Sequence, residues 1–302
     1  MIIPAPADLA GRYRIANGSR FRLKDIDPAD PWGKRLKPIA DQMLKQGRKR
    51  LTGLQERLYA QDRWSVLLIF QAMDAAGKDG TIKHVMAGVN PQGCEVHPFK
   101  APSTEELDHD FLWRTTRWLP RRGHIGIFNR SYYEETLVVR VHQNILGKQQ
   151  LPSGLVTKDI WRERFEDINA HERYLSRQGV LVRKFFLHVS KDEQAKRFLE
   201  RLDRPEKHWK FSPADVGERK HFAAYMTAYE DMIRHTSTEW APWFVVPADR
   251  KWFTRLVVSS AIIDAIESLD PRFPEVDPQV RAEFKRLKTV LEAERPPKVR
   301  KK

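Results

Sequence analysis

The stretch Val66-Leu-Leu-Ile-Phe-Gln-Ala-Met-Asp-Ala-Ala-Gly-Lys-Asp-Gly-Thr-Ile-Lys83 decides the fold. An apolar strand runs into a turn of small residues that ends at Gly77-Lys78, and a helix is predicted over 80–89. Backbone N–H groups of such a turn, with the first free N–H groups of the helix, form a concave anion site. Lys78, which we expect to be catalytic, adds a positive charge that can follow a transferred phosphoryl group. The phosphate-binding residues predicted here are Ala75, Ala76, Gly77, Lys78, Asp79 and Gly80.

The turn departs from the Walker pattern G-x-x-x-x-G-K-[ST] in two places and carries an unusual carboxylate in a third. Ala72 stands at the first glycine position, and Asp79 replaces the Ser or Thr that normally reaches magnesium. The carboxylate of Asp74 lies inside the loop, where it would repel phosphate unless a cation lay between them. We therefore expect Asp74 to be a catalytic residue that binds Mg²⁺, directly or through water, with Mn²⁺ as the alternative ion.

Outward from this stretch, strands and helices alternate. Nearly continuous apolar segments predict strands at 64–70, 94–97, 123–128, 180–189 and 243–246. Helices are predicted at 34–61 (kinked or broken near Gly47), 103–118, 131–142, 157–177, 190–202, 212–237 and 249–268. Helix–strand alternation with buried strands is typical of a parallel sheet covered on both faces. The predicted fold class is therefore α/β: a P-loop kinase-like parallel sheet of about five strands flanked by helices.

Three segments are expected along the chain. Residues 1–33 are an N-terminal arm that Pro and Gly punctuate as loop. Residues 34–268 form a single P-loop kinase-like domain. Residues 269–302 are a charged C-terminal tail, which we expect to fray and which ends Pro296-Pro-Lys-Val-Arg-Lys-Lys302.

Composition narrows the class of partner. The 302 residues include 54 Lys plus Arg against 40 Asp plus Glu, a formal net charge of +14. Such a field attracts a polyanion, whether nucleic acid, an anionic membrane surface or a phosphate-rich molecule. The single cysteine, Cys94, excludes an intramolecular disulfide and a multi-cysteine zinc site. With no apparent leader and no apolar run long enough to span a bilayer, we expect a cytoplasmic protein without a membrane partner.

A basic segment after the fourth predicted strand is expected to be a helical lid around 197–215. Arg197 and Arg201 lie four residues apart on one helix face, an unfavourable arrangement unless an anion lies against them. The alternative is a solvated basic face offset by Glu193 and Glu200. For the lid we expect Arg201 to be catalytic. Phosphate binding is also predicted for Arg197, Lys207 and Lys210 of the lid. The same role is predicted for Lys83 on the predicted helix 80–89.

With its neighbours, the phosphate-binding stretch resembles the polyphosphate kinase 2 family over roughly residues 34–268. The motifs that carry the resemblance are Met73-Asp-Ala-Ala-Gly-Lys-Asp-Gly80, His84-Val-Met-Ala-Gly-Val-Asn-Pro-Gln-Gly93, Phe99-Lys-Ala-Pro102, His109-Asp-Phe-Leu-Trp-Arg114, Phe128-Asn-Arg-Ser-Tyr-Tyr-Glu134, Arg201-Leu-Asp-Arg-Pro-Glu-Lys-His-Trp-Lys-Phe-Ser212 and Ala241-Pro-Trp-Phe-Val-Val-Pro-Ala-Asp249. The resemblance implies Mg²⁺-assisted phosphoryl transfer between inorganic polyphosphate and nucleoside mono- and diphosphates. AMP would give ADP and ADP would give ATP, with guanine nucleotides also used. It also suggests a homo-oligomer, a dimer or tetramer.

The resemblance also places nucleotide-binding residues. Phe128-Asn-Arg-Ser131 occupies the Walker B region, where many relatives carry Asp in place of Asn129. Asn129 can still hydrogen-bond phosphate or metal-bound water. Glu134 resembles the residue that marks the branch of this family accepting both mono- and diphosphates. Arg114 and Arg130 follow elements that lead towards the strand ends, where ligands of open parallel sheets bind, and Arg130 is also expected to be catalytic.

The hypothesis is direct in-line transfer, which needs positioning and charge neutralisation and no covalent nucleophile. One alternative is an ATP-dependent kinase of nucleotides or another small metabolite, which would share the phosphate-binding loop. A second is a nucleic-acid-binding protein. The sequence has no zinc finger, RNA-recognition aromatic motif or evident basic recognition helix, so we expect no stable nucleic-acid partner.

Overall fold

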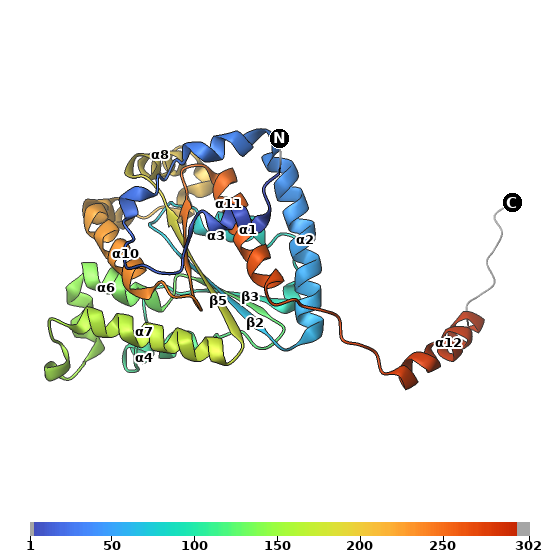
Figure 1. Ribbon diagram of the computed structural model, residues 1–302. Helices are drawn as coiled ribbons and strands as arrows, with labels where there is room; N and C mark the ends of the chain where they lie inside the picture. Colours follow the sequence, from blue (N-terminus) through green and yellow to red (C-terminus); the bar gives the residue numbers. More distant parts are fainter. Residues whose placement is uncertain (1–2, 295–302) are drawn as a thin grey trace.

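Six strands form one mostly parallel sheet in the computed structural model, which describes residues 3–294 (Figure 1). Their order across the sheet is β1-β6-β5-β2-β4-β3. The strands are β1 (Arg14–Ile15), β2 (Ser65–Gln71), β3 (Cys94–Pro98), β4 (Ile125–Asn129), β5 (Val180–His188) and β6 (Trp243–Pro247). Strands β2 to β6 run parallel, which confirms the predicted five-stranded sheet. The sixth, β1, comes from the segment predicted to be loop and pairs antiparallel with β6 at one edge.

The central strand β2 determines where ligands can bind. All seven of its residues are buried, because apolar residues face helices on both sides of the sheet. Strand β4 lies on one side of β2 and β5 on the other, so the chain leaves β2 at a point where strand order reverses. Crevices at the carboxyl ends of strands form at such points.

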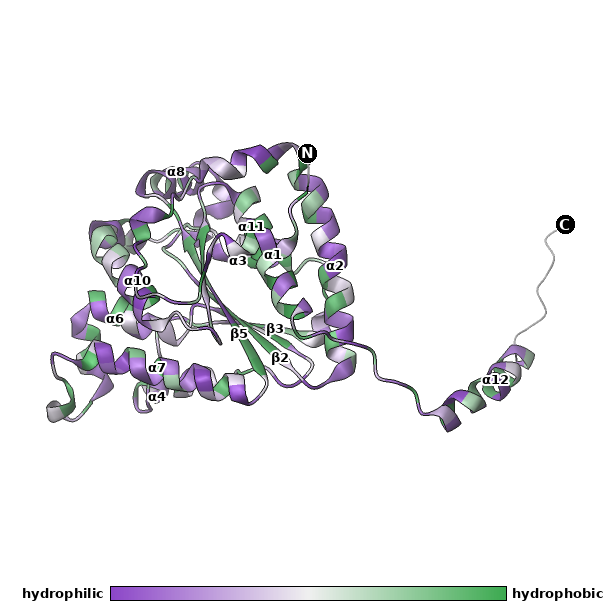
Figure 2. Cartoon of the chain, viewed as in Figure 1, coloured by the Kyte–Doolittle hydropathy of each residue, from purple (hydrophilic) through white to green (hydrophobic). Residues whose placement is uncertain are grey.

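Helices cover both faces of the sheet (Figure 1). One face carries α1 (Pro6–Gly11), α2 (Ala40–Gln61), α3 (Lys78–Val85) and α11 (Lys251–Glu267), and the other α6 (Val138–Val141), α7 (Ile160–Arg177) and α10 (Phe222–Thr236). The remaining α-helices are α4 (Thr104–Leu107), α5 (Trp113–Thr116), α8 (Lys191–Leu202), α9 (Pro213–Glu218) and α12 (Pro278–Ala293). Short 3-10 helices are η1 (Leu23–Asp25), η2 (Pro31–Ile39), η3 (Pro91–Gly93), η4 (Tyr132–Thr136), η5 (Gln143–Gln149), η6 (Ser153–Leu155), η7 (Pro205–Lys210) and η8 (Arg219–His221). Figure 2 shows the hydrophobic strands enclosed by helices of mixed polarity.

The predicted break near Gly47 is wrong, because α2 runs through it without interruption. A Cβ at this position would lie 3.0 Å from Oγ of Ser259 on α11. The glycine therefore allows α2 and α11 to pack closely and does not end a helix.

The helix predicted over 103–118 forms only at its two ends. The capping box of Ser103 and Glu106 is present and starts α4. Further on, the Asp110 side chain accepts hydrogen bonds from the backbone N–H groups of Leu112 and Trp113, at 2.9 and 3.2 Å. Such side-chain bonds compete with a continuous helix, so the chain re-enters helical structure only at α5.

The C-terminal segment is more ordered than the sequence indicates. Asp277 caps α12 by accepting from the backbone N–H of Gln279, so the fraying expected for this region is wrong between Pro278 and Ala293. The helix projects away from the sheet (Figure 1). The terminal stretch from Pro296 lies outside the described residues. Among residues 3–294, no helix combines the length and apolar character needed to cross a membrane.

Candidate active site

The turn after β2 is a phosphate-binding loop in its backbone geometry. Ala75 and Gly77 both have positive φ angles, 63° and 104°, and α3 begins at Lys78. Residues of alternating handedness turn successive N–H groups towards one point and so form an anion-binding nest. A left-handed alanine costs about 1–2 kcal/mol, which the surrounding contacts must offset. The local sequence therefore builds the predicted cradle even though Ala72 stands at the first glycine position.

Lys78 is folded back under this loop. Its Nζ donates to the carbonyl oxygen of Ala72 at 2.7 Å, and the side chain is buried. Burial, reinforced by the nearby Arg130 guanidinium, lowers the Lys78 pKa to about 8. Asp74, Glu134 and Asp79 oppose this shift in the Lys78 pKa. The ammonium group is thus held where additional negative charge from a phosphate would stabilise it.

Arg130 joins the loop to the neighbouring strand. It follows β4 with a left-handed backbone (φ 65°), and its N–H donates to the carbonyl oxygen of Phe70 at 3.0 Å. Its guanidinium donates to Asp74 at 2.7 Å and to Glu134 at 2.9 Å. Gln71 holds the other carboxylate oxygen of Glu134 at 2.8 Å. The two carboxylates raise the Arg130 pKa, so this side chain remains a cation. The structure therefore brings Asp74, Arg130 and Glu134 together; of these, Arg130 was expected near the loop from its place at a strand end.

Asn129 and Asp79 form a second polar pair at the strand ends. Asn129 donates from Nδ2 to Asp79 Oδ1 at 2.8 Å. Asp79 also lies 3.9 Å from Nζ of Lys210, which comes from η7. The residue that replaces the Walker Ser or Thr therefore connects the loop to the Walker B region and to the predicted lid.

Arg197 lies behind the loop with its donors directed at protein groups. Its five N–H donors all have protein partners: Glu193 at 2.8 Å and the carbonyl oxygens of Ala75 (3.2 Å), Ala76 (2.7 Å), Ala248 (2.6 Å) and Asp249 (3.2 Å). A guanidinium has no sixth donor, so phosphate could bind Arg197 only by displacing one of these bonds. The side chain is 4% exposed. This geometry favours a role in holding the loop backbone over the predicted direct contact with phosphate.

Four other predicted basic residues, Lys83, Arg201, Lys207 and Lys210, line an open cleft of about 920 Å³ beside the loop. Its lining includes Asp74, Ala75, Gly77, Lys78, Asp79, Gly80, Lys83, Lys100, Asn129, Arg130, Arg197, Arg201, Lys207, Trp209, Lys210, Asp215 and Lys251. Ala76 is buried beneath the cleft and is not part of this lining. Arg201 lies 3.8 Å from Asp215 and 3.5 Å from the carbonyl oxygen of Lys210. Helix α8 and η7 therefore present lysine and arginine to the loop, as expected of a lid.

A second cavity of about 490 Å³ adjoins the cleft. Its lining combines apolar side chains, Phe111, Val138, Val139 and Ile145 among them, with Arg114, Arg130 and Glu134. Arg114 is fixed by the carbonyl oxygen of Lys100 at 2.8 Å and by Glu106 at 3.4 Å. The sequence analysis did not assign Lys100, which lines both cavities. The sequence signal for Lys100 was its position in the motif Phe99-Lys-Ala-Pro102.

The site fits a magnesium ion that a substrate helps to bind. Among residues 3–294, no three Asp, Glu, His or Cys side chains converge into a metal cluster. Mg²⁺ commonly uses one or two carboxylates and completes its coordination with water and phosphate oxygens. Asp74 faces the cleft and uses one oxygen for Arg130; its Oδ2 accepts no hydrogen bond from any residue that the structure describes. This oxygen is available for such an ion.

Comparisons with known proteins agree with this geometry. The sequence model of the family described as Polyphosphate kinase 2 (PPK2) matches residues 37–274. The "ADP-polyphosphate phosphotransferase" of Rhodopseudomonas palustris is 50% identical over 282 residues, which cover 93% of this chain and 97% of that protein. The "AMP/ADP-polyphosphate phosphotransferase" of Meiothermus ruber is 44% identical over 265 residues, 87% of this chain and 95% of that protein.

A solved structure extends the similarity to the fold. The crystal structure of Polyphosphate Kinase 2 from Arthrobacter aurescens superposes with a TM-score of 0.82 at 39% sequence identity. The match covers 97% of this chain and 98% of that one. Sequence and fold agree over nearly the whole length, and the chain therefore belongs to the polyphosphate kinase 2 family.

Proposed function

We propose that the protein transfers phosphoryl groups between inorganic polyphosphate and nucleotides, phosphorylating AMP to ADP and ADP to ATP. Guanine nucleotides are proposed as further acceptors. The observation that carries this proposal is the junction of two unlike cavities at Arg130, directly beside Lys78 and the phosphate-binding loop. Relatives named for the same reaction support it.

Each cavity suits one substrate. The open cleft has lysine and arginine on both the loop and the lid, which suits a polyanion too long to be enclosed. The smaller cavity combines an apolar wall with two arginines, which suits a nucleotide with an apolar base face and a charged phosphate. We therefore assign polyphosphate to the cleft and the acceptor nucleotide to the smaller cavity, named here the acceptor pocket.

The chain's own residues supply positioning and positive charge. The loop N–H groups and Lys78 bind phosphate oxygens, and Arg130 holds the acceptor phosphate beside them. Arg201, Lys207 and Lys210 close over the donor from the lid. Charge in a phosphoryl transfer is spread over equatorial oxygens, so aligned donors stabilise the transition state without a covalent intermediate.

Asp74 is the residue proposed to hold Mg²⁺, with Mn²⁺ as the alternative. The ion, when bound, neutralises phosphate charge that would otherwise be repelled by the carboxylate. Arg130 orients Asp74 through the 2.7 Å hydrogen bond to Oδ1, which leaves Oδ2 of Asp74 for the ion.

Glu134 supports the assignment to the branch that accepts mono- and diphosphates. It is fixed by Gln71 and Arg130 at the edge of the acceptor pocket. The relatives differ in their named acceptors, ADP in one and AMP or ADP in the other. Acceptor choice is therefore the part of the proposal that most needs a direct test.

The test supplies purified protein with Mg²⁺, long-chain polyphosphate and AMP, ADP, GMP or GDP in separate reactions. Products are separated by ion-exchange chromatography. We expect ADP and ATP from AMP, and a loss of roughly 10²- to 10⁴-fold in rate in Lys78→Ala, equivalent to about 3–5 kcal/mol. ATP from ADP alone would refute the dual-acceptor assignment. Turnover with ATP and a small-molecule acceptor but not polyphosphate would identify an ordinary ATP-dependent kinase. DNA binding without any turnover would overturn the enzyme assignment.

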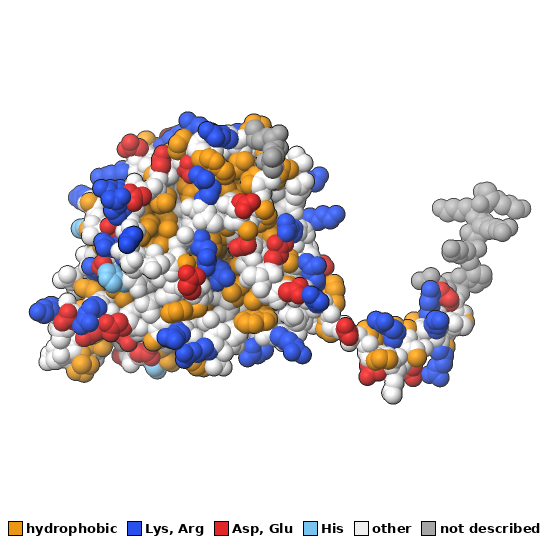
Figure 3. Space-filling model, in the orientation of Figure 1, with side chains coloured by type: hydrophobic (Ala, Val, Ile, Leu, Met, Phe, Trp, Pro, Cys, Tyr) orange, Lys and Arg blue, Asp and Glu red, His pale blue; other side chains and the backbone are white. Residues whose placement is uncertain are grey.

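The protein is also proposed to form homo-oligomers, dimers or tetramers, with helix α12 as one contact. Val280, Phe284, Leu287 and Leu291 lie at alternating spacings of four and three residues on α12, and all are exposed. This is the a/d spacing of a two-stranded coiled coil. Hydrophobic side chains are visible on the projecting helix in Figure 3. A second copy of α12, aligned in parallel, would cover them.

Charge complementarity favours this parallel partner. In the same heptad frame, Glu283 occupies a g position and Lys288 the following e position. These positions face each other between parallel helices, so each copy would offer a carboxylate to the other's ammonium. An antiparallel pair would instead bring Arg281 and Lys288, both cations at e positions, against each other.

A cytoplasmic location is proposed on one observation. Cys94 is the only cysteine and is free and partly buried, as suits a reducing compartment. Secretion of the active protein into the medium would contradict this location.

A further inference from the structure

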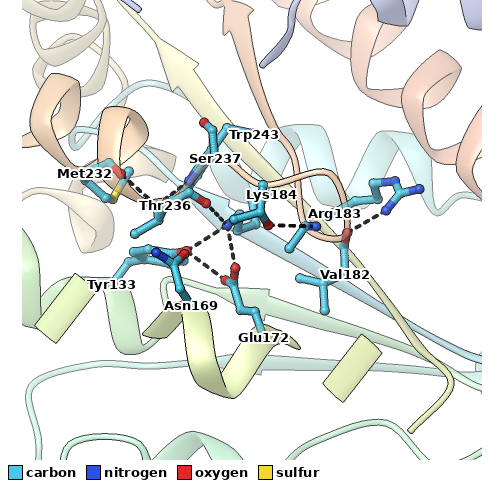
Figure 4. Close-up of polar contacts among 12 residues, drawn as sticks. Tyr133, Asn169, Glu172, Val182, Arg183, Lys184, Met232, Thr236, Ser237 and Trp243 are labelled. Carbon is cyan, nitrogen blue, oxygen red and sulfur yellow. Dashed lines mark hydrogen bonds and ion pairs between the residues drawn. The ribbon is translucent and has the colours of Figure 1, made fainter. Parts of the chain in front are cut away.

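A cluster of buried polar groups surrounds Lys184 (Figure 4), and one of its members, Tyr132, lines the acceptor pocket. Lys184 on β5 donates from Nζ to Glu172 Oε2 on α7 at 2.6 Å, to Tyr133 Oη at 2.9 Å and to the carbonyl oxygen of Thr236 on α10 at 2.7 Å. The hydroxyls of Tyr133 and Tyr132 both donate to Glu172 Oε1, at 2.7 and 2.9 Å. We name these five residues the Lys184 cluster. It ties η4 to three other elements of the fold.

The cluster is fully satisfied and fully enclosed. Lys184 and Glu172 are 0% exposed, and the three donors of the ammonium group have three acceptors. Burial lowers the pKa of Lys184, while Glu172 opposes that change. Burial and the Glu172 charge raise the pKa of both tyrosines, which therefore remain neutral hydroxyl donors. The sequence signal was a lysine inside the apolar strand 180–189, to which no role was assigned.

The segment that carries both tyrosines forms part of the wall of the acceptor pocket, which Tyr132 itself lines. Ser131, Tyr132, Glu134 and Glu135 line that pocket, and Arg130 immediately precedes them. Arg130 and Glu134 meet on the pocket side, where Arg130 also contacts Asp74. Tyr132 and Tyr133 lie between them in sequence; both are buried, and both hydroxyls donate to Glu172. The short segment 130–134 is thus fixed both by the site and by the Lys184 cluster.

We propose that the Lys184 cluster positions Arg130 and Glu134 for the acceptor nucleotide. It acts through the two tyrosine hydroxyls, which set the depth and rotation of η4, and its members touch no reacting atom. Displacements of about 1 Å in residues that orient a substrate can cost on the order of 10²-fold in rate. This role rests on the proposed nucleotide-phosphorylating function of the same site.

The best variant removes one hydroxyl and leaves the ion pair intact. Lys184→Met would leave the Glu172 charge buried without its partner and risks unfolding the protein. Tyr133→Phe keeps the ring and the Lys184–Glu172 pair but removes the Tyr133 bonds to both, so that η4 keeps only the Tyr132 bond to Glu172. Tyr13→Phe is the matched control, because Tyr13 is also buried and its hydroxyl also binds a carboxylate, that of Asp30. Tyr13 lies in the N-terminal segment and lines neither cavity.

The experiment compares acceptor kinetics, nucleotide affinity and melting temperature in the wild type and both variants. AMP and ADP are varied at saturating polyphosphate, and AMP binding is also measured by calorimetry without a donor. We expect both variants to melt about 2–4 °C lower. Only Tyr133→Phe should lose about 10-fold or more in kcat/KM for the acceptor and bind AMP more weakly. Tyr13→Phe should remain within about twofold of wild type.

The outcomes separate this proposal from the proposed function. Tyr133→Phe with unchanged AMP affinity and unchanged acceptor kinetics, but the lower melting temperature, would show that the cluster only stabilises the fold. A wild type without turnover on polyphosphate would refute the proposed function, and the AMP affinities would still decide whether the cluster positions the pocket. Equal losses in both variants would also overturn the positioning role.

Discussion

Lys78 is a cation kept in a place that favours its neutral form. Burial lowers its pKa to about 8, so near that pH about half of the free protein carries a neutral Lys78. A bound polyphosphate favours the charged form and must raise the Lys78 pKa. Affinity for polyphosphate should therefore fall as pH rises through 8, because binding then requires protonation first.

This reasoning predicts proton uptake on binding. At pH 8, polyphosphate binding should take up about half a proton per site through Lys78, and at pH 6.5 almost none. Calorimetry in two buffers of different ionisation enthalpy measures the uptake. Polyphosphate titrates on its own account, so the quantity of interest is the difference between wild type and Lys78→Ala. Equal uptake in the two proteins would show that Lys78 does not change its protonation on binding.

At the scale of single elements, helix α8 carries two arginines with different surroundings. Arg197 points behind the loop and makes five hydrogen bonds, whereas Arg201 lies at the cleft beside Asp215. The i, i+4 spacing predicted a shared face and a shared anion. It could not reveal that the loop carbonyl oxygens, which are distant in sequence, would occupy all the donors of one arginine.

Methionine substitutions should separate the two roles. Arg197→Met leaves several buried carbonyl oxygens and Glu193 without donors, so we expect about 2–4 kcal/mol lower free energy of unfolding. Arg201→Met removes a partly exposed ion pair and should change stability by less than about 1 kcal/mol while lowering kcat at least tenfold. Denaturant titration and steady-state kinetics measure both. Comparable stability losses in the two variants would contradict this division.

The sequence predicted features formed by residues close together in the chain and missed contacts between distant ones. Apolar runs predicted the strand positions, and a run of small residues predicted the loop. Both are local signals, because β2 and its turn are formed by residues adjacent in sequence. The position of Arg130 near the phosphate-binding loop followed from parallel strand ends meeting at one edge, but its contact with Asp74 was not predicted. The Lys184 cluster could not be predicted, because its partners come from α7, α10 and η4, and only the packed structure brings them together. The predicted helix over 103–118 took no account of Asp110, whose side-chain hydrogen bonds compete with a continuous helix. The interruption between α4 and α5 was therefore missed.

At the scale of the whole molecule, α12 is the element most separated from the sheet. Its proposed parallel pairing predicts which engineered cysteines can cross-link two copies. In a Cys94→Ser background, Leu287→Cys at the seam should form a disulfide-linked dimer under mild oxidation. Thr289→Cys, on the opposite side of the helix, should not. Denaturing electrophoresis without reductant measures the product.

The orientation is tested by a second pair of positions. Val280→Cys should cross-link by itself in a parallel pair, whereas an antiparallel pair would join positions 280 and 291 from two different variants. No cross-linking at the seam, or equal cross-linking at position 289, would contradict the pairing. Recruitment of the protein to anionic vesicles through α12 would instead show that this apolar face binds a membrane.

The two cavities share Lys100 and Arg130 in their linings. The proposed assignment of polyphosphate to the cleft and the nucleotide to the acceptor pocket places both substrates against these two residues, so direct transfer requires both to be bound together. Double-reciprocal plots of initial rate, taken at several fixed concentrations of the second substrate, should then intersect. Parallel lines would indicate that the phosphoryl group rests on the protein between two separate half-reactions. Intersecting lines would show that the enzyme binds both substrates before the phosphoryl group is transferred.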